Sequence, residues 1–455
     1  MASRDGQETT QTAARLVSRS VSIPPTPLRD VLRMDRPIHA AWTAPGERTL
    51  VASGAATTVA TDGSDRFATI RDRGANAFDT LDTTDVAREA RPRFIGGFAF
   101  HDRHDRVTPW QEFPGAWFVL PKVQVVLGDD GGWITVTADA SDRTTTELDT
   151  LADSIRDGVL TAGPVGTAPG VESTTRATTY DQWTDQLDGA LARIENGEIE
   201  KVTLAQTLRA ELGAPFALAG TLERLGETYP DCFRFSFRPD ADEYPTTPPG
   251  EEPAAAPTFF GASPERLVTK QGESLLTGAL ASTVGRGETP AEDDRLTATL
   301  ESDEKFEREH EVVVQSIHDQ LAPVARNVRP GERSVRKLDS VQHLYTPVEA
   351  TPIAEHVLDL VEALHPTPAV GGLPPSVALE TIRRTEAFDR GWYAAPVGWF
   401  DESGDGTFAV GIRSAVAAAT TATLFAGNGI VADSNPHAEW DEVQLKYEPI
   451  LDALR

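Results

Sequence analysis

The sequence predicts a mixed α+β fold, in which strands pair with their neighbours along the chain instead of alternating with helices. Three observations support this prediction. Short apolar runs bounded by Thr, Gly and Asp fill the first third of the chain, as expected of strands joined by turns. Segments with apolar residues every three or four positions indicate helices further along. Pairs of strand-like runs separate these helical segments.

The first part of the chain divides into a tail and a strand-rich region. Residues 1–25 are polar and lack the apolar core of a signal peptide, so we expect a flexible tail. Residues 26–165 contain strand-like runs at 93–100 and 116–121 and form the N-terminal part of the fold. A linker rich in Gly and Pro is predicted at 162–178.

Residues 175–455 form the remainder of what we expect to be one large α+β domain. A helix over 179–197 is predicted by apolar residues spaced four, four and three positions apart, namely Trp183, Leu187, Leu191 and Ile194. Residues 239–257 are rich in Pro and Glu without an apolar pattern, which indicates a surface insertion. Strands are expected at 201–205, 258–261, 266–269, 397–401, 407–412 and 422–426, and helices at 291–328, after Thr351 and at 436–454.

The charge of the chain restricts its partners. The 455 residues include 70 acidic and 42 basic side chains, for a formal net charge of −28. Such a field repels nucleic acids and anionic membranes, so we expect neither as a partner. An anionic substrate requires cations placed locally. Only six lysines are present. An acid-rich, lysine-poor composition favours adaptation to a high-salt cytoplasm, and an ordinary acidic bacterial enzyme is the alternative.

Cys232 is the only cysteine, which excludes an intrachain disulfide and a site built from several cysteines. Its strand-like surroundings favour a buried structural thiol over a nucleophile. A reducing cytoplasm is the compartment that fits this composition. No stretch approaches 18 uninterrupted apolar residues, so we expect no transmembrane helix. We take a monomer as the default oligomeric state.

The last predicted helix carries charged residues on one face. Asn435 followed by Pro436 is a good N-terminal cap. Glu439, Glu442 and Lys446 then fall at positions i, i+3 and i+7, so all three share a face that Ile450 continues toward the core. The face therefore indicates a functional group of charges, and an exposed Glu–Lys pair is the alternative.

The helix predicted at 291–328 also carries a carboxylate on its apolar face. Val313, Ile317 and Leu321 define its apolar stripe, and Glu309 lies four residues before Val313 on the same stripe. A carboxylate in that position must be paired, protonated or bound to a metal. Carboxylates from two helices suit Mg²⁺, which prefers oxygen ligands. The spacing leaves open whether the two helices meet.

Further candidates for chemistry lie at strand ends and in loops. Lys201 opens an apolar strand, where it either reaches outward harmlessly or acts as a base if it is desolvated. Glu265 follows a turn between two strands and is a candidate general acid, although exposed loop glutamates are common. Arg413 ends a strand and is suited to gripping a carboxylate. His343 and His365 lack metal-pair spacing, and Gly-Asn-Gly at 427–429 is too short to indicate nucleotide binding.

Taken together, these segments resemble the chorismate-utilising enzyme family, whose members make isochorismate, salicylate, anthranilate or aminodeoxychorismate. The resemblance is strong over 180–455 and weak at 95–100 and 117–121, within a variable N-terminal part. The matching segments are KVTLA at 201–205, GASPER at 261–266, EKFEREH at 304–310, VQHL at 341–344, LHPTPA at 364–369, EAFDR at 386–390, PVGW at 396–399, GIR at 411–413, FAGNGI at 425–430, and EWDE at 439–442 followed by Lys446.

The resemblance implies a fold of two packed, mostly antiparallel sheets with helices on the outside. It implies that Glu309 and Glu442 bind Mg²⁺ and that Glu439 is a nearby acid acting through water. Arg413 and Lys446 match groups that bind the carboxylates of chorismate. The other substrate-binding positions implied by the resemblance are Thr283, His343, Ala369, Tyr393 and Gly429.

Three positions indicate which reaction to expect. Lys201 matches the base of the water-adding members, where anthranilate-forming relatives usually carry Gln. Ala281 replaces the nucleophilic lysine of the aminodeoxychorismate synthases, and Ala369 replaces the Thr of salicylate- and anthranilate-forming relatives. The resemblance therefore implies Mg²⁺-dependent conversion of chorismate into isochorismate, with Lys201 as base and Glu265 as acid. Salicylate formation, anthranilate formation and an inactive chorismate-binding protein are the alternatives.

One residue departs from the family pattern. Relatives usually have Gly at the position of Ser282, where the backbone approaches the substrate. Glycine permits both a close approach and a positive φ angle. The substitution predicts a slightly reshaped pocket around Thr283.

Overall fold

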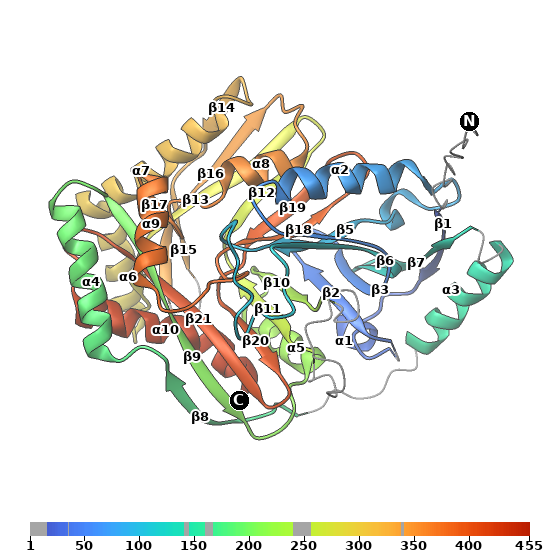
Figure 1. Cartoon of the computed structure of the whole chain (residues 1–455), viewed down its shortest axis with the longest axis horizontal. Coiled ribbons are helices and arrows are strands. Elements are labelled where there is room, and N and C mark those ends of the chain that lie inside the picture. Colours follow the sequence, from blue (N-terminus) through green and yellow to red (C-terminus); the bar gives the residue numbers. More distant parts are fainter. Residues whose placement is uncertain (1–15, 35, 141–144, 160–166, 240–255, 338–340) are drawn as a thin grey trace, which may run out of the picture.

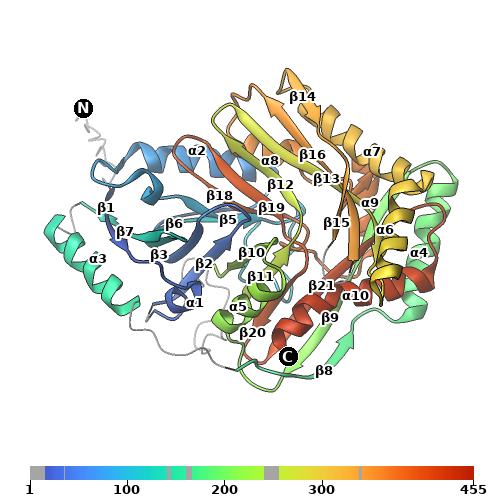
Figure 2. The ribbon, with the colours of Figure 1, turned by 180° about the vertical axis from the view of Figure 1, so that it is seen from behind.

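The structure is a computed structural model of the whole chain, and it describes residues 16–34, 36–140, 145–159, 167–239, 256–337 and 341–455. The described strands form one hydrogen-bonded network, which is antiparallel except between β1 (Leu16–Ile23) and β4 (Leu81–Asp82). Helices lie on the outside of the network (Figures 1 and 2). The predicted α+β class is confirmed.

The network branches at the long strand β6 (Ala116–Gly128). Strand β3 pairs along almost all of β6, whereas β5 and β7 pair with different halves of it. The first arm runs from β6 through β3 (Thr49–Thr61), β2 (Ile38–Thr43), β10 (Phe233–Phe237), β11 (Thr258–Ser263), β20 (Ser414–Ala418) and β21 (Thr421–Ile430) to β9 (Lys201–Leu212), which β8 (Val171–Arg176) and β17 (Gly372–Leu373) flank.

The second arm leaves the other edge of β6. It runs through β5 (Phe94–Phe98), β18 (Pro396–Phe400), β19 (Gly406–Val410), β12 (Arg266–Gln271) and β13 (Ser274–Gly285) to β16 (Val341–Thr351), which also pairs with β14 (Asn327–Pro330) and β15 (Ser334–Lys337). Strand β7 (Gly131–Asp139) joins β6 to β1. The two sheets implied by the sequence are therefore two arms of one network.

Two hydrophobic cores fill the molecule, because successive side chains along a strand point to opposite faces. Phe259 and Phe425 belong to the first core, whereas their neighbours Phe260 and Leu424 belong to the second. The first core is covered by α2 (Arg66–Asp79), α4 (Tyr180–Glu195), α7 (Glu304–Leu321), α8 (Val357–Leu364) and α9 (Pro375–Thr385). The second is covered by α1 (Leu28–Val31), α3 (Thr145–Val159), α5 (Leu218–Thr228) and α10 (Pro436–Leu454).

Two predicted helices begin at capping residues, of which the sequence predicted the cap at Asn435. The Thr179 hydroxyl accepts a hydrogen bond from the backbone N–H of Gln182, whose side chain accepts one from the Thr179 N–H, so α4 begins with a capping box. The Asn435 side chain accepts hydrogen bonds from the first N–H groups of α10. These caps fix where each helix starts, and α10 carries the charged face into the structure.

Two predictions of irregular segments are wrong in part, and a third is largely untested. The expected tail over 1–25 includes β1, which pairs with β7 over eight residues, while residues 1–15 lie outside the described part. The expected linker over 162–178 includes β8, which pairs with β9. Most of the predicted insertion at 239–257 lies outside the described residues.

The helix predicted at 291–328 is two helices, α6 (Pro290–Ser302) and α7. Asp303 separates them in an extended conformation, and its carboxylate accepts a hydrogen bond from the backbone N–H of Lys305. An aspartate that bonds the first N–H groups of a helix is a strong start signal. It therefore ends α6 and starts α7 in a new direction, and the chain is already extended in β14 by Asn327.

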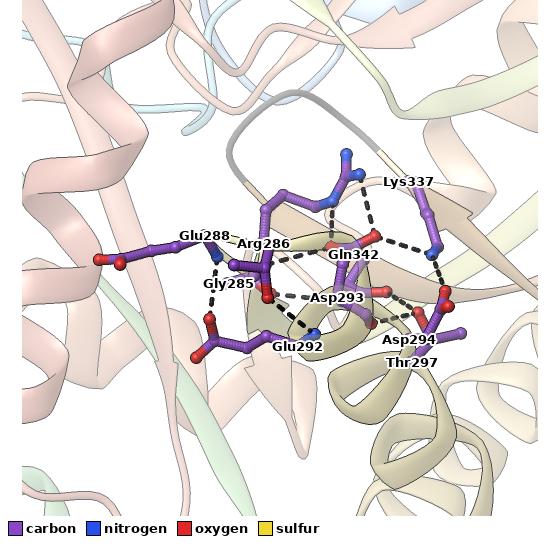
Figure 3. A network of polar contacts seen from close by, with 11 residues as sticks. Gly285, Arg286, Glu288, Glu292, Asp293, Asp294, Thr297, Lys337 and Gln342 are labelled. Carbon is purple, nitrogen blue, oxygen red and sulfur yellow. Dashed lines mark hydrogen bonds and ion pairs between the residues drawn. The ribbon is translucent and has the colours of Figure 1, made fainter.

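A network of ion pairs ties the start of α6 to the end of β13 (Figure 3). The buried Asp293 carboxylate accepts hydrogen bonds from Arg286 at 2.6 and 3.0 Å and from Lys337 at 2.9 Å. These two cations hold the pKa of Asp293 well below its usual range.

None of the described helices is both long enough and apolar enough to cross a membrane.

Replacing Asp293 with Asn is expected to lower the unfolding temperature by several degrees, because two cations lose a buried partner. Thermal unfolding followed by circular dichroism at neutral pH measures this change. Asp294→Asn is the matched control, since the Asp294 side chain is 83% exposed and lies 4.0 Å from Lys337. Equal unfolding temperatures for the two variants would show that the network does not hold α6 in place.

Candidate active site

Two adjoining cavities collect all twelve predicted site residues. The first, here called the carboxylate cavity, has a volume of about 300 Å³ and is lined by Lys201, Glu309, Gly429, Glu439 and Glu442. The second, here called the arginine cavity, has a volume of about 100 Å³ and is lined by Glu265, His343, Tyr393 and Arg413. Both cavities share the walls Leu280, Thr283, Ala369, Gly427 and Lys446. The structure therefore places the predicted residues in one continuous region.

Lys201 lies at the first position of β9 and points into the carboxylate cavity. Its Nζ donates a hydrogen bond to Oε1 of Glu309 at 2.9 Å, and the two charges form an ion pair. Gly429 on the neighbouring β21 leaves room for this side chain, because a Cβ at position 429 would lie 2.6 Å from Lys201 Cε. Lys201, the candidate base, is thus buried, is hydrogen-bonded to Glu309 and packs against Gly429.

Glu309 extends from α7 into the same cavity, as its position on the apolar stripe predicts. Its second oxygen, Oε2, lies 3.2 Å from the hydroxyl of Ser282. Burial alone would raise the pKa of Glu309, but the charge and hydrogen bond of Lys201, together with Ser282, lower it. Glu309 is therefore ionised at neutral pH despite its burial.

The charged face of α10 forms the opposite wall of the cavity. Lys446 donates hydrogen bonds to the Gly427 carbonyl at 2.9 Å and to Asn428 at 2.6 Å, and it forms an ion pair with Glu442 at 2.8 Å. Glu439 accepts a hydrogen bond from Asn428 Nδ2 at 2.9 Å. Burial and the negative charge of Glu442 raise the pKa of Glu439. The predicted face is thus turned inward, and it concentrates negative charge.

Glu265 lies in the turn between β11 and β12 and is buried in the arginine cavity. The Thr367 hydroxyl donates a hydrogen bond to its Oε1 at 3.1 Å. Burial raises the pKa of Glu265 to about 7, although Thr367 and the charge of Lys201 oppose this rise. A carboxyl group with a pKa near neutrality holds a proton that it can release during a reaction.

Arg413 lines the arginine cavity with a buried guanidinium group that has no ion-pair partner among the described residues. Burial lowers its pKa, which shows that the charge is poorly solvated. Tyr393 stacks against Phe425 beside it, with ring centroids 5.4 Å apart. An unpaired guanidinium group in a cavity of this size is suited to a carboxylate ligand.

His343 lies beside Thr283 on the neighbouring strand in the wall of the arginine cavity, and its Nδ1 lies 2.8 Å from the Thr283 hydroxyl. Burial and the charge of Arg413 lower the pKa of His343 well below its usual value, so the ring is neutral. Its Nε2 is buried without a hydrogen-bond partner among the described residues. The other predicted histidine, His365, donates or accepts elsewhere, at the Phe100 carbonyl, and lines neither cavity.

Sequence reasoning missed three supporting residues. Asn428 contacts both Glu439 and Lys446, and the available signal was its place in the matching segment 425–430. Thr367 bonds Glu265, and its neighbours in the segment 364–369 were the available signal. The buried Glu386 forms an ion pair with Arg390 and accepts a hydrogen bond from the Ala205 N–H, which holds β9 from behind.

The donor set of the carboxylate cavity fits an oxygen-preferring divalent ion. Glu309, Glu439 and Glu442 line one cavity, and Glu439 already carries an unfavourable like charge from Glu442. In the described part of the chain no three His, Cys, Asp or Glu side chains converge into a complete metal centre. Mg²⁺ commonly takes one or two carboxylates and completes its shell with water or substrate oxygens, so this arrangement is compatible with it.

The two antiparallel arms enclose a small cavity system with a buried acid, a buried amine and a guanidinium group that has no ion-pair partner in the described part of the chain. Such a site is typical of an enzyme that acts on a small molecule. The family model of the chorismate-binding enzymes matches residues 3–455 of the sequence. The chain therefore belongs to this family. This membership agrees with the resemblance noted from the sequence segments.

Curated relatives and solved structures agree with the family. The chain is 32% identical over 372 residues to isochorismate synthase MenF of Bacillus subtilis, and 35% identical over 373 residues to the salicylate biosynthesis isochorismate synthase of Pseudomonas aeruginosa. Each match covers 80% of this chain and 74% of the relative. The structure of MenF from Escherichia coli superposes with a TM-score of 0.78 at 24% identity, covering 97% of this chain and 96% of that one.

The same fold also occurs in a relative with a different name. The structure of anthranilate synthase component I from Streptococcus pneumoniae superposes with a TM-score of 0.72 at 20% identity, covering 90% of this chain and 93% of that one. Fold similarity therefore does not separate the reactions of the family, and the separation must come from residues in the site.

Proposed function

We propose that the protein is an isochorismate synthase, an isomerase that adds water at C2 of chorismate and expels the C4 hydroxyl. The observation that carries the proposal is the placement of the Lys201 amine and the Glu265 acid in two adjoining cavities that share their walls. The isochorismate synthase names of the relatives, at 32% and 35% identity, support the same reaction.

The cations of the site would bind the two carboxylates of the substrate. Arg413 offers a guanidinium group without a competing ion pair, and Lys446 lies on the wall common to both cavities. The ring would then lie against Tyr393, Ala369 and the Thr283–His343 pair. These cations would supply the local positive charge that a small dianion requires in a chain whose overall charge is −28.

Glu309 and Glu442 would hold a Mg²⁺ ion, with Glu439 contributing through water. When bound, such an ion neutralises a substrate carboxylate and withdraws charge from the ring. In this structure the Lys201 Nζ donates a hydrogen bond to Glu309. Lys201 can act as a base only as a neutral amine, so this contact must break and the amine must be free of its extra proton before Nζ takes a proton from water.

The chemistry balances with these two residues. Lys201 takes a proton from the attacking water as the new bond to C2 forms, and the ring double bonds shift. The bond from C4 to its oxygen breaks, and Glu265 supplies the proton that the departing hydroxyl needs to leave as water. Neither oxidant nor reductant is consumed. Glu265 is suited to this role because its pKa is about 7.

Incubation of the purified protein with chorismate and Mg²⁺ tests the proposal, with the products resolved by chromatography. We expect isochorismate as the product. Salicylate together with pyruvate would instead identify a salicylate synthase, and fluorescent anthranilate after addition of ammonium would identify an anthranilate-forming enzyme. Binding of chorismate without turnover would identify an inactive chorismate-binding protein.

We also propose that the protein works in the cytoplasm of a cell with high internal salt. The support is the excess of 28 negative charges together with only six lysines. Salt at molar concentration screens the mutual repulsion of exposed carboxylates, which is strong in dilute buffer. The assay is therefore run in multimolar KCl and repeated after dialysis to low salt, where we expect loss of activity and a lower unfolding temperature. Equal activity in both buffers would contradict the high-salt proposal alone.

A further inference from the structure

Ser282 has an unusual backbone conformation in the wall of the carboxylate cavity. It lies at a bulge in β13, where the pairing with β16 shifts between Ala281 and Thr283. Its φ angle is +58°, in the left-handed region that a residue with a Cβ atom rarely adopts. Glycine would be favoured at this position on backbone grounds alone, so the serine side chain must provide something that compensates.

The Ser282 side chain contacts α7, which carries Glu309. Its Oγ lies 2.8 Å from the carbonyl oxygen of Phe306 and 3.2 Å from Oε2 of Glu309. The hydroxyl has one proton, so it donates to one of these acceptors at a time. Ser282 is itself buried, and it lines the carboxylate cavity together with Glu309.

The two oxygens of Glu309 are held from two sides when the Ser282 hydroxyl donates to Glu309 instead of to the Phe306 carbonyl. Lys201 donates to Oε1 from β9, and Ser282 approaches Oε2 from β13. If Lys201 is released to act as a base, Ser282 is the remaining contact that orients this carboxylate among those described above. Groups that orient a metal-binding carboxylate through a hydrogen bond contribute strongly to metal affinity.

We propose that Ser282 is a positioning residue, which fixes the Glu309 carboxylate toward the carboxylate cavity for a divalent cation. This inference rests on the proposed function. It assigns the hydroxyl a role that opposes the backbone preference of the same position. Removal of the hydroxyl should therefore weaken cation binding while relief of the positive φ angle stabilises the fold.

Two variants separate these effects. Ser282→Gly removes the hydroxyl and the Cβ, so its unfolding temperature without Mg²⁺ should equal or exceed that of the wild type. Ser282→Ala removes the hydroxyl and keeps the Cβ, so it loses a hydrogen bond without relief of the positive φ angle. Its unfolding temperature should therefore be lower than that of the wild type. Titration calorimetry of the metal-free proteins with MgCl₂ should give an affinity weaker by on the order of 10-fold for both variants.

Ser18→Ala is the matched control. Ser18 lies on β1, which contributes no residue to either cavity. Its hydroxyl is buried and forms a hydrogen bond of 2.8 Å with the Thr137 hydroxyl. This variant should lose stability without any change in Mg²⁺ affinity. In turnover assays Ser282→Gly should require about 10-fold more Mg²⁺ for half-maximal rate, while the rate at saturating Mg²⁺ changes less.

Wild-type Mg²⁺ affinity in Ser282→Gly would overturn the proposal. A fall in the unfolding temperature of Ser282→Gly to that of Ser282→Ala would also overturn it, because the serine would then serve the fold only. The calorimetry separates this inference from the proposed function. If the wild type makes no isochorismate while Ser282→Gly still weakens Mg²⁺ binding, the reaction assignment fails and the positioning role stands. Absence of Mg²⁺ binding to the wild type would reject the positioning role.

Discussion

Replacing Lys201 with Ala is expected to lower kcat for isochorismate formation by about 10²–10⁴-fold, the usual contribution of a positioned general base. The amine is buried at the start of β9, and among the described residues it forms an ion pair with Glu309 alone. Lys305 and Lys446 also line this cavity, but the side chain that lies against Gly429 is that of Lys201. Steady-state rates on chorismate, measured by product chromatography at saturating Mg²⁺, give the result.

Lys270→Ala is the matched control for this variant. Lys270 is also buried, and its Nζ forms an ion pair with Asp405 at 2.7 Å, but it lines neither cavity of the site. Both variants leave one buried carboxylate without its cation, so both should be less stable than the wild type. Only Lys201→Ala should lose turnover. Near-wild-type isochorismate formation by Lys201→Ala would disprove its assignment as the base.

Replacing Glu265 with Gln is expected to cost a similar factor of about 10²–10⁴ in kcat, because Gln cannot supply a proton to the departing hydroxyl. The substitution keeps the shape of the side chain and an oxygen that accepts from Thr367. For the wild type, kcat/KM should fall as the pH rises through about 7, where Glu265 loses its proton. Residual activity of Glu265→Gln should lack this descending limb.

The same carboxyl group should affect stability in a predictable direction. Its folded-state pKa of about 7 lies above its ordinary value of 4.5, so the folded protein holds this proton more tightly than the unfolded chain. The associated stability is complete below pH 4.5 and is lost as the pH rises through about 7. The loss amounts to roughly 3 kcal/mol. Unfolding free energies of Glu265→Gln relative to the wild type should therefore increase across this window, and a constant difference would contradict the raised pKa.

The fold was predictable where local chemistry decides the structure. The apolar spacing of α4 and the Asn435–Pro436 cap of α10 predicted these two helices, because capping and amphipathic packing are local properties of the sequence. Strand β8 was missed because its residues are mostly exposed and show no apolar alternation. Strand β1 was missed because it is held by eight residues of pairing with β7, which lies far away in the sequence. Asp303 was a usable cap signal within a charged run that continues the helical pattern.

The site was predictable as a set of residues but not as a set of contacts. Helical spacing predicted that Glu309 and the face of α10 turn inward, and the family segments supplied Lys201, Glu265 and Arg413. The ion pair between Lys201 and Glu309 joins residues 108 positions apart, so only the tertiary structure reveals it. Likewise, the positive φ angle of Ser282 depends on the bulge in β13.

The central claim is that one cation and one small ring lie side by side in the two adjoining cavities, with the amine and the acid acting on the ring. A crystal structure of Glu265→Gln with Mg²⁺ and chorismate tests it most directly, since this slow variant keeps the cavity shape. We expect the ion on Glu309 and Glu442, a substrate carboxylate on Arg413, and the ring between positions 201 and 265. An ion bound away from Glu309 and Glu442, or a ring outside the walls shared at Thr283 and Ala369, would contradict the account.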